Sequence, residues 1–306
     1  MATTSGAEPS DGRLSWARRA TVRRTVLRWG AAHFRDLPWR ATRDPWAVLV
    51  SEVMLQQTQA HRVVDPYRRF LERFPTPAAC ASAGVGATVR AWAGLGYNRR
   101  AVHLHRAATL VVEEHGGAPP GDLAGLQSLP GVGPYTARAV LVFAFEVDTG
   151  VVDTNVARLL ARAVAGRPLS APAAQSLADQ LVPPGQGWAF NQALFDLGAA
   201  HCTARAPRCA GCPLRRSCRW AAAGWPQPDP ARTTAGTSRP QGRFGGSDRQ
   251  GRGRVVAALR VGPLGPEEAR RATGWPDDAD RADRVCASLV VDGVARVGRD
   301  GRLRLA

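Results

Sequence analysis

The chain contains no lysine. Its basic side chains are 41 arginines, against 25 acidic residues, which gives a formal net charge of +16 at pH 7. A GC-rich coding sequence is a simple explanation for this bias, but the absence has a chemical consequence. Without a lysine amine, no mechanism that passes through a lysine Schiff base is available to this protein.

Long apolar runs are also missing. No stretch of 18 or more apolar residues could form a membrane-spanning helix, and the N-terminus lacks the charged and apolar segments of a signal peptide. We therefore expect a cytoplasmic protein that does not act at a membrane. The positive charge then favours nucleic acid as a partner over an anionic membrane surface.

Strand patterns are absent from most of the sequence. No alternation of apolar and polar residues occurs before residue 285, so the first 220 residues are predicted to be all-α. Residues 1–15 are small and polar and are predicted to form a disordered tail. Helical spacing of apolar residues predicts helices over 16–34, 45–58, 61–74, 77–83, 86–92, 99–115, 122–128, 136–145, 154–165, 171–181 and 187–200.

The composition changes after the all-α part. Residues 220–252 are rich in Pro, Gly, Ser, Thr and Arg without apolar periodicity, which is typical of a linker. Residues 253–306 predict three helices followed by a hairpin at Asp300-Gly301. That order is typical of a winged helix with the hairpin as its wing. A small capping domain without a role in DNA binding is the alternative.

The stretch LPGVGPYTARAVLVFAFEVDTGVVDTN, residues 129–155, combines a tight turn with a carboxylate. Gly131 and Gly133 would let backbone N–H groups approach a ligand, and Pro134 stands where a helix would begin. A helix start beside a glycine turn is a good phosphate site. Asp153 follows about one helix later, which suggests chemistry on a nucleotide. A Gly-Pro loop joining two core helices is the alternative.

A single acidic residue, Glu52, lies within the most apolar predicted helix. Asp44 supplies an N-cap and Pro45 the first helical position, and apolar residues then almost surround the helix. Because such a helix is buried, Glu52 should be buried or lie at a cleft. An isolated buried carboxyl group holds its proton to higher pH, as a general acid must. An ordinary surface glutamate is the alternative.

The turn GLGYNRR, residues 94–100, presents Tyr97 beside two arginines. An aromatic ring of this kind can wedge between bases while the arginines hold phosphates. A turn that joins two helices through a packed tyrosine is the alternative.

Four of the six cysteines lie within seventeen residues, separated by six, two and five residues. They are Cys202, Cys209, Cys212 and Cys218. Two disulfides do not fit easily into so short a cytoplasmic loop, so we interpret the four as thiolate ligands of one metal centre. A [4Fe–4S] cluster is favoured over zinc, which usually takes two close CxxC pairs. Five arginines would make the loop face phosphates: Arg205, Arg208, Arg215, Arg216 and Arg219.

Seven motifs between Leu37 and Cys218 follow the order of one family. They are LPWR, SEVMLQQTQ, GLGY, LPGVGPYTA, VVDTNVAR, FNQALFDLGA and the C-x6-C-x2-C-x5-C loop. The chain thus resembles the MutY-type A/G-specific adenine DNA glycosylases of the helix-hairpin-helix, endonuclease III superfamily, in a short actinobacterial-like form. The resemblance implies an all-α, two-lobed glycosylase domain over 16–219, with an iron–sulfur loop at 202–218. A small α+β winged-helix-like domain would follow at 253–306.

The resemblance implies that adenine mispaired with 8-oxoguanine or guanine is removed in base excision repair. Glu52 would protonate adenine at N7, and Asp153 would stabilise the oxocarbenium-like sugar. Tyr135 and Asn155 would assist around them. These roles fit the chemistry, because breaking an N-glycosidic bond requires a proton on the base and negative charge near C1′. The adenine must also leave the base stack.

The resemblance further implies that two groups of residues contact the DNA. The protein is expected to bind DNA as a monomer. Gln192 is expected at the adenine pocket. Tyr97, Gln57 and Thr58 are expected in the gap around the opposing base.

The second group lies at the pocket rim and the phosphate backbone. Arg35 and Arg40 are expected beside the pocket, with Trp39 packed there. Gly131 and Gly133 are expected at a phosphate.

Two features depart from the family pattern. Many members carry DGN and GLGYY where this chain has DTN at 153–155 and GLGYN at 94–98. Many bacterial members also end in a larger Nudix-like domain that reads 8-oxoguanine, for which the residues after 252 are too few. The recognition of 8-oxoguanine therefore needs another explanation in this chain.

Two other functions compete with adenine removal. An endonuclease III-like lyase requires a lysine in the hairpin, where this chain has Tyr135. Thymine-mismatch glycosylases can also carry tyrosine there, and Glu52 is what favours adenine. A non-catalytic iron–sulfur DNA-binding protein would have no use for both Glu52 and Asp153.

Overall fold

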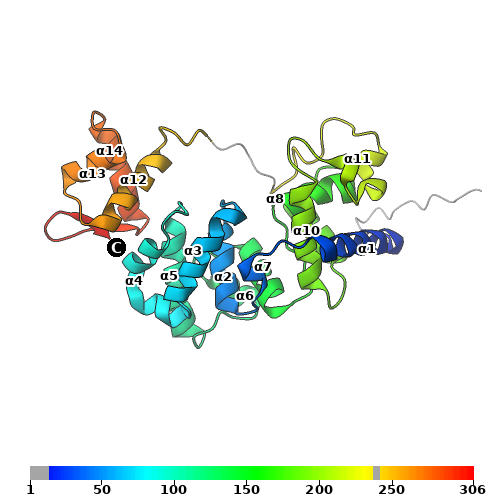
Figure 1. The fold of residues 1–306 in the computed structure, drawn as a ribbon, viewed down its shortest axis with the longest axis horizontal. Helices are drawn as coiled ribbons and strands as arrows, with labels where there is room; N and C mark the ends of the chain where they lie inside the picture. Colours follow the sequence, from blue (N-terminus) through cyan, green and yellow to red (C-terminus); the bar gives the residue numbers. More distant parts are fainter. Residues whose placement is uncertain (1–13, 237–241) are drawn as a thin grey trace, which may run out of the picture. The chain divides into compact units, whose positions relative to one another are not determined.

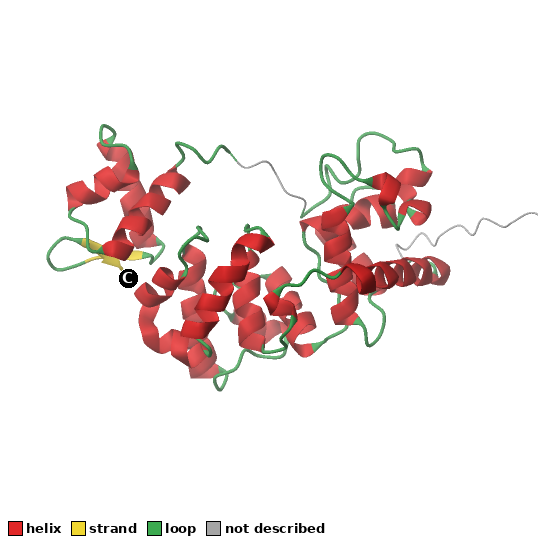
Figure 2. Cartoon of the chain, in the orientation of Figure 1, coloured by secondary structure: helices red, strands yellow, loops and turns green. Residues whose placement is uncertain are grey.

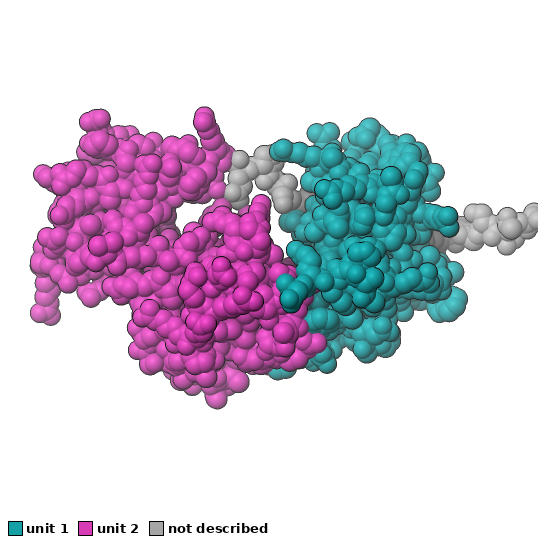
Figure 3. Space-filling view, viewed as in Figure 1, with its two compact units in different colours: residues 1–36, 138–239 teal, residues 37–137, 240–306 magenta. Residues whose placement is uncertain are grey.

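The computed structural model describes residues 14–236 and 242–306. The chain divides into two compact units, drawn in teal and magenta in Figure 3. The first unit combines residues 1–36 with 138–239, and the second combines 37–137 with 240–306. Each unit is therefore assembled from two separate stretches of sequence.

The second unit begins with consecutive helices (Figure 1). They are η1 (Pro38–Arg40), α2 (Pro45–Leu55), α3 (Ala60–Arg73), α4 (Pro77–Ala91), α5 (Arg99–Glu114), α6 (Leu123–Ser128) and the start of α7 (Pro134–Phe145). Gly84 has φ 78° and ψ 163°, which breaks α4 into the two shorter helices that the sequence predicts.

Helix α2 shows why these elements form where they do. The Asp44 carboxylate accepts hydrogen bonds from Trp46 N and Ala47 N, and Pro45 occupies the first helical position. All nine residues from Trp46 to Met54 are buried. The helix is therefore held by burial on every side.

The first unit contains α1 and most of the helices that follow α7. They are α1 (Trp16–His33), α8 (Thr154–Leu159), the π-helical turn η2 (Leu160–Ala165), α9 (Ala171–Leu181), α10 (Gly187–Ala200), the short turns η3 (Cys209–Gly211) and η4 (Arg215–Ser217), and α11 (Arg219–Ala222). Helix α1 packs closely on α10, since a side chain at Gly30 would lie 2.4 Å from Ala193 Cβ.

Both predicted unstructured segments are shorter than expected. Residues 1–13 of the predicted tail lie outside the described residues, but Leu14 is buried and Ser15 caps α1. Within the predicted linker, Asp229 and Thr234 pack against the first unit through hydrogen bonds to Arg162 and Leu169. These contacts are not visible in the composition, because they depend on partners more than 60 residues away.

Residues 242–306, which we call the C-terminal module, form three helices and a hairpin. They are α12 (Asp248–Val261), α13 (Pro266–Thr273), α14 (Ala279–Val291), β1 (Ala295–Val297) and β2 (Leu303–Leu305). The strands pair antiparallel with Ala295 opposite Leu305. Among the described residues, strands occur only here (Figure 2). The predicted fold class, all-α with a small α+β winged-helix-like end, is confirmed. No helix in the described ranges combines the length and apolarity needed to cross a bilayer.

Candidate active site and cysteine cavity

Asp153 is the N-cap of α8 in the first unit. Its Oδ1 accepts a hydrogen bond from Val156 N at 2.7 Å, and its Oδ2 accepts one from Asn155 Nδ2 at 2.8 Å. Burial raises the pKa of Asp153, whereas these hydrogen bonds and the charge of Arg158 limit the rise. The carboxylate is thus held in one orientation by donors that favour its ionised form.

Asn155 continues this network towards the cysteines. Its Oδ1 accepts a hydrogen bond from Arg158 at 2.7 Å, and the same guanidinium donates through Nε to the carbonyl of Cys202. A side chain at Gly198 would lie 3.1 Å from Asn155 Cβ, so the glycine of the FNQALFDLGA motif leaves room for this residue. Asp153, Asn155 and Cys202 are therefore linked through Arg158, a residue to which the sequence assigned no role.

Asn191 on α10 holds the segment that leads to Asp153. Its side chain accepts a hydrogen bond from Val151 N at 2.8 Å and donates to the carbonyls of Thr149 and Gly187. It is buried, as is its neighbour Gln192. The motif led to a prediction for Gln192 but not for Asn191, because no local feature of the sequence shows that the Asn191 amide binds backbone atoms 40 residues away.

Arg35 lies beside the same helix. Its Nε donates to Asp196 Oδ1 at 2.6 Å, and its backbone N–H donates to Asp196 Oδ2. The Asp196 side chain is buried, whereas that of Arg35 is half exposed. In the second unit, Trp39 is buried edge-on against Tyr67 with ring centroids 5.6 Å apart, and Arg40 ends the short turn η1.

Glu52 is buried on α2 with only 3% of its surface exposed. The end of this helix is fixed by Arg100, whose guanidinium donates to the carbonyls of Val53, Met54 and Gln56. Burial lowers the pKa of Arg100 to about 10. The expectation that both arginines of GLGYNRR hold phosphates is therefore wrong for Arg100. Its acceptors lie more than 40 residues away, beyond what a local pattern can show.

The predicted hairpin joins α6 to α7 in the second unit. Gly131 has φ 80° and is exposed, and a side chain there would lie 2.8 Å from His103 Cβ. Gly133 is also exposed, and a side chain there would meet nothing within 4 Å. Gln56 donates to Thr136 Oγ1 at 3.2 Å, which ties the hairpin to the end of α2. Tyr135 lies in the first turn of α7 and is half-buried.

The residues expected around the opposing base lie on two turns of the second unit. Gln57 is exposed with φ 57°, and the hydroxyl of Thr58 accepts a hydrogen bond from Arg100 at 3.1 Å. Tyr97 is 41% exposed with φ 46°, and the Arg100 guanidinium lies 5.5 Å from its ring centroid. Arg100 therefore connects the two turns.

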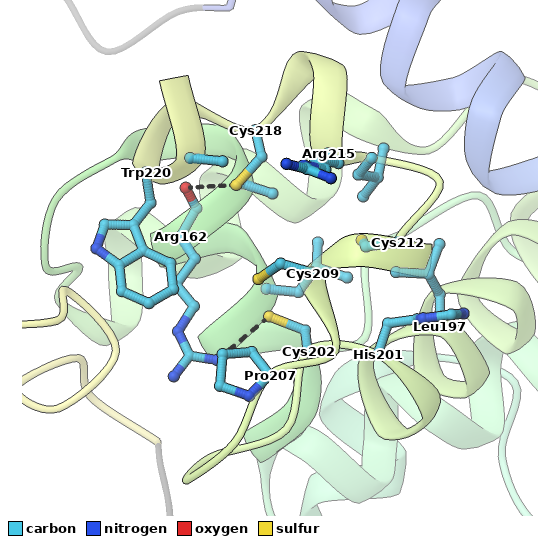
Figure 4. A pocket seen from close by; sticks show the side chains of 14 residues that line it. Arg162, Leu197, His201, Cys202, Pro207, Cys209, Cys212, Arg215, Cys218 and Trp220 are labelled. Carbon is cyan, nitrogen blue, oxygen red and sulfur yellow. Dashed lines mark hydrogen bonds between the residues drawn. The ribbon is translucent and has the colours of Figure 1, made fainter. Parts of the chain in front are cut away.

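The four clustered cysteines line one cavity in the first unit. They are Cys202, Cys209, Cys212 and Cys218, all free thiols. Figure 4 shows Cys202, Cys209 and Cys218 pointing into this cavity. Within residues 14–236 and 242–306, no three His, Cys, Asp or Glu side chains converge closely enough for a single metal ion. Burial raises the pKa of Cys212 to about 11, so a thiolate there needs a positive partner.

Arg162 forms one wall of the cavity (Figure 4). It contacts Cys202 Sγ at 3.5 Å, donates to Asp229 at 3.0 and 2.5 Å, and lies 4.9 Å from the ring centroid of Trp220. Its side chain is 2% exposed. Arg162 therefore ties the cysteine loop to the chain that follows it. Four of the five loop arginines are exposed: Arg205, Arg208, Arg215 and Arg216.

Each unit contains part of the predicted site. Asp153, Asn155, Gln192, Arg35 and the four cysteines lie in the first unit. The second unit contains Glu52, Trp39, Arg40, Gln57, Thr58, Tyr97, Gly131, Gly133 and Tyr135.

Known proteins match this chain over most of its length. Residues 50–184 match the family described as HhH-GPD superfamily base excision DNA repair protein. An adenine DNA glycosylase from Mycolicibacterium smegmatis is 43% identical over 285 residues, which cover 92% of this chain and 94% of that protein. The chain belongs to the adenine DNA glycosylase family of the HhH-GPD superfamily. The resemblance stated from the motifs is confirmed, as is the expectation of an enzyme.

Thymine-DNA glycosylases are more distant relatives. One from Aeropyrum pernix is 37% identical over 214 residues, covering 67% of this chain and 96% of that protein. A solved structure of a thermostable thymine-DNA glycosylase superposes with a TM-score of 0.63 at 30% identity, covering 68% of this chain and 98% of that one. The fold alone therefore does not distinguish the two substrates.

Proposed function

We propose that this protein is a monofunctional DNA glycosylase that removes adenine opposite 8-oxoguanine or guanine in base excision repair. The observation that supports it best is the contrast between Asp153, oriented by two N–H donors, and Glu52, buried on an apolar helix. Hydrolysis of an adenine N-glycosidic bond requires one ionised and one protonated carboxyl group.

Glu52 acts on the base after the adenine has been flipped out of the duplex. The protonated carboxyl group donates to N7, which makes adenine a better leaving group. Gln192 contacts the flipped adenine. Arg35, Arg40 and Trp39 contact the flipped nucleotide around the base.

Asp153 acts on the sugar. Its ionised carboxylate stabilises the positive charge that develops at C1′ as the bond to adenine breaks, and water then adds at C1′. Asn155 keeps Asp153 oriented, and Tyr135 assists at the sugar. Since the chain contains no lysine, no lysine Schiff base forms, and lysine-dependent cleavage of the DNA strand is excluded.

A duplex with an A:8-oxoguanine or A:G mispair is the partner, bound by one copy of the protein. Gly131 and Gly133 present backbone N–H groups to a phosphate beside the start of α7. Tyr97 inserts in the gap beside the opposing base, flanked by Gln57 and Thr58. The arginine excess supplies the sequence-independent part of the affinity.

A [4Fe–4S] cluster is the cofactor we propose for the cysteine cavity. Four thiolates bound to one zinc ion would lie about 3.8 Å apart. A cluster that offers one iron to each thiolate would instead suit four thiols spread around the lining of a cavity, as these are. When bound, it would hold the loop through residues Cys202, Cys209, Cys212 and Cys218. Cys209→Ser should remove an absorbance near about 400 nm. A colourless wild-type protein that contains zinc would contradict the cluster.

Removal of thymine from a T:G mismatch is the second candidate function. It is favoured by the match to thymine-DNA glycosylases and by a tyrosine in the hairpin, Tyr135. Glu52 distinguishes the two, because protonation at N7 is useful only for a purine.

The test is a glycosylase assay on four duplexes, with and without alkali. We expect excision from adenine opposite 8-oxoguanine and guanine, little from adenine opposite thymine, and none from a T:G mismatch. Strand breaks should require alkali. Excision of thymine, or breaks without alkali, would overturn the proposal.

A further inference from the structure

Tyr97 adopts a backbone conformation that requires support. Its φ of 46° is in the left-handed region, which is unfavourable for a residue other than glycine. Gly94 and Gly96 beside it also have positive φ, so the whole turn is tightly wound. Conformations of this kind persist where surrounding contacts hold them and are concentrated at functional sites.

The C-terminal module contacts the side chain of this tyrosine. Arg249, in the first turn of α12, donates through Nη1 to the Tyr97 hydroxyl at 3.2 Å and through Nη2 to the Gly242 carbonyl at 2.7 Å. The same guanidinium lies 5.9 Å from the ring centroid of Phe244. It therefore bridges the start of the module and the tip of Tyr97.

Other contacts fix the module on the helices that flank the turn. Arg260 of α12 donates to Asn98 Oδ1 and to the Val89 carbonyl, each at 3.2 Å. Arg99 forms an ion pair of 3.5 Å with Asp292, which follows α14.

The last residue of the chain completes this interface. A side chain at Gly86 of α4 would lie 2.6 Å from the carbonyl oxygen of Ala306, so the two backbones are in close contact. Contacts from α12, the end of α14 and the C-terminus therefore hold the module against both helices that border the turn.

We propose that the C-terminal module is part of the site that reads the base opposite the adenine, and that Arg249 is the residue that positions Tyr97 there. The proposal rests on the proposed function. An inserted ring discriminates between neighbouring bases only if its plane is fixed before the DNA binds. A mobile ring can adapt to any neighbouring base, and it also loses rotamer freedom on binding. Holding both the backbone turn and the hydroxyl fixes that plane.

The inference gives the C-terminal module a role in distinguishing the base opposite the adenine. One lost hydrogen bond of about 1 to 1.4 kcal/mol corresponds to about a 5- to 10-fold change. Arg249→Ala should therefore reduce the preference for 8-oxoguanine over guanine by about that factor. It should leave the single-turnover rate of adenine release at saturating enzyme within about twofold, since it contacts neither carboxylate.

The experiment is a double-mutant cycle with the full-length protein. Binding is measured to duplexes that carry a non-hydrolysable 2′-fluoro-adenosine opposite 8-oxoguanine or guanine. The variants are Arg249→Ala, Arg249→Lys, Tyr97→Phe and the combination of Arg249→Ala with Tyr97→Phe. Arg299→Ala, at an exposed arginine of the same module, removes the same charge and is the matched control.

Arg249→Ala and Tyr97→Phe should each reduce the preference by about 5- to 10-fold, and the combination should reduce it no further than either alone. Arg249→Lys should recover part of it, which also distinguishes positioning from misfolding. An unchanged preference in Arg249→Ala, additive losses in the combination, or an equal loss in Arg299→Ala would overturn the inference. None of these outcomes affects adenine excision by the wild type, whose absence would instead overturn the proposed function.

Discussion

The two proposed catalytic carboxyl groups have different surroundings. Asp153 in the first unit accepts two hydrogen bonds and is linked through Asn155 to Arg158. Glu52 in the second unit lies within nine consecutive buried residues of one helix, seven of which are apolar. Groups of the same chemical type take different protonation states when their surroundings differ in this way. The proposed mechanism therefore uses Asp153 in its ionised form and Glu52 in its protonated form.

Removing either carboxylate should have the largest effect. Glu52→Gln and Asp153→Asn should each slow single-turnover adenine release by about 10²- to 10⁴-fold, because each loses a group that acts only in the transition state. Affinity for the mispaired duplex should remain close to that of the wild type. Glu72→Gln, at an exposed glutamate, is the control. Release at nearly the wild-type rate in either variant would refute the role of that carboxylate.

Breaking the buried ion pair between Arg162 and Asp229 at the cysteine cavity should have the second largest effect. Arg162→Met leaves Asp229 without its partner and should destabilise the first unit by about 3 to 5 kcal/mol. Chemical denaturation measures the change, and Arg208→Met at an exposed arginine of the loop is the matched control. Equal unfolding midpoints for the two variants would show that the pair does not hold the loop.

A smaller change should appear in the pH dependence of adenine release. Asn155→Ala removes a donor to the ionised form of Asp153 and so raises its pKa further. The acid side of the pH–rate profile should move up by about one pH unit, which lowers the rate about tenfold on that side. Glu72→Gln, at an exposed glutamate, is the control and should leave the profile unchanged. An acid side that stays at the wild-type position in Asn155→Ala would contradict the role of this hydrogen bond.

The smallest effect concerns the exposed arginines of the cysteine loop. If Arg216 contacts a phosphate, Arg216→Ala should reduce the slope of log affinity against log salt by about 0.9. Binding titrations at several salt concentrations measure this slope. Arg24→Ala on α1, also exposed, should leave it unchanged. Equal slopes for both variants would remove this loop from the DNA contacts.

Local features of the sequence were sufficient to predict the helices and the turns. The Asp44 cap, the break at Gly84 and the glycine hairpin are found where the residues predict them, because each depends on neighbours within a few positions. The winged-helix-like order of the C-terminal module is predictable for the same reason.

Long-range partners account for what the sequence reading missed. Arg100 resembles a surface cation until its acceptors at the end of α2 are known, and Asn191 and Arg158 resemble ordinary polar residues on helices. Such side chains bind backbone atoms that are 40 or more residues away. No spacing rule identifies those partners.

The pH dependence of single-turnover adenine release by the wild type tests the central claim most directly. The account predicts a rate that falls at low pH as Asp153 takes up a proton, and Asn155→Ala should move this fall to higher pH. A rate that stays constant at low pH while chemistry limits turnover would contradict the ionised role proposed for Asp153.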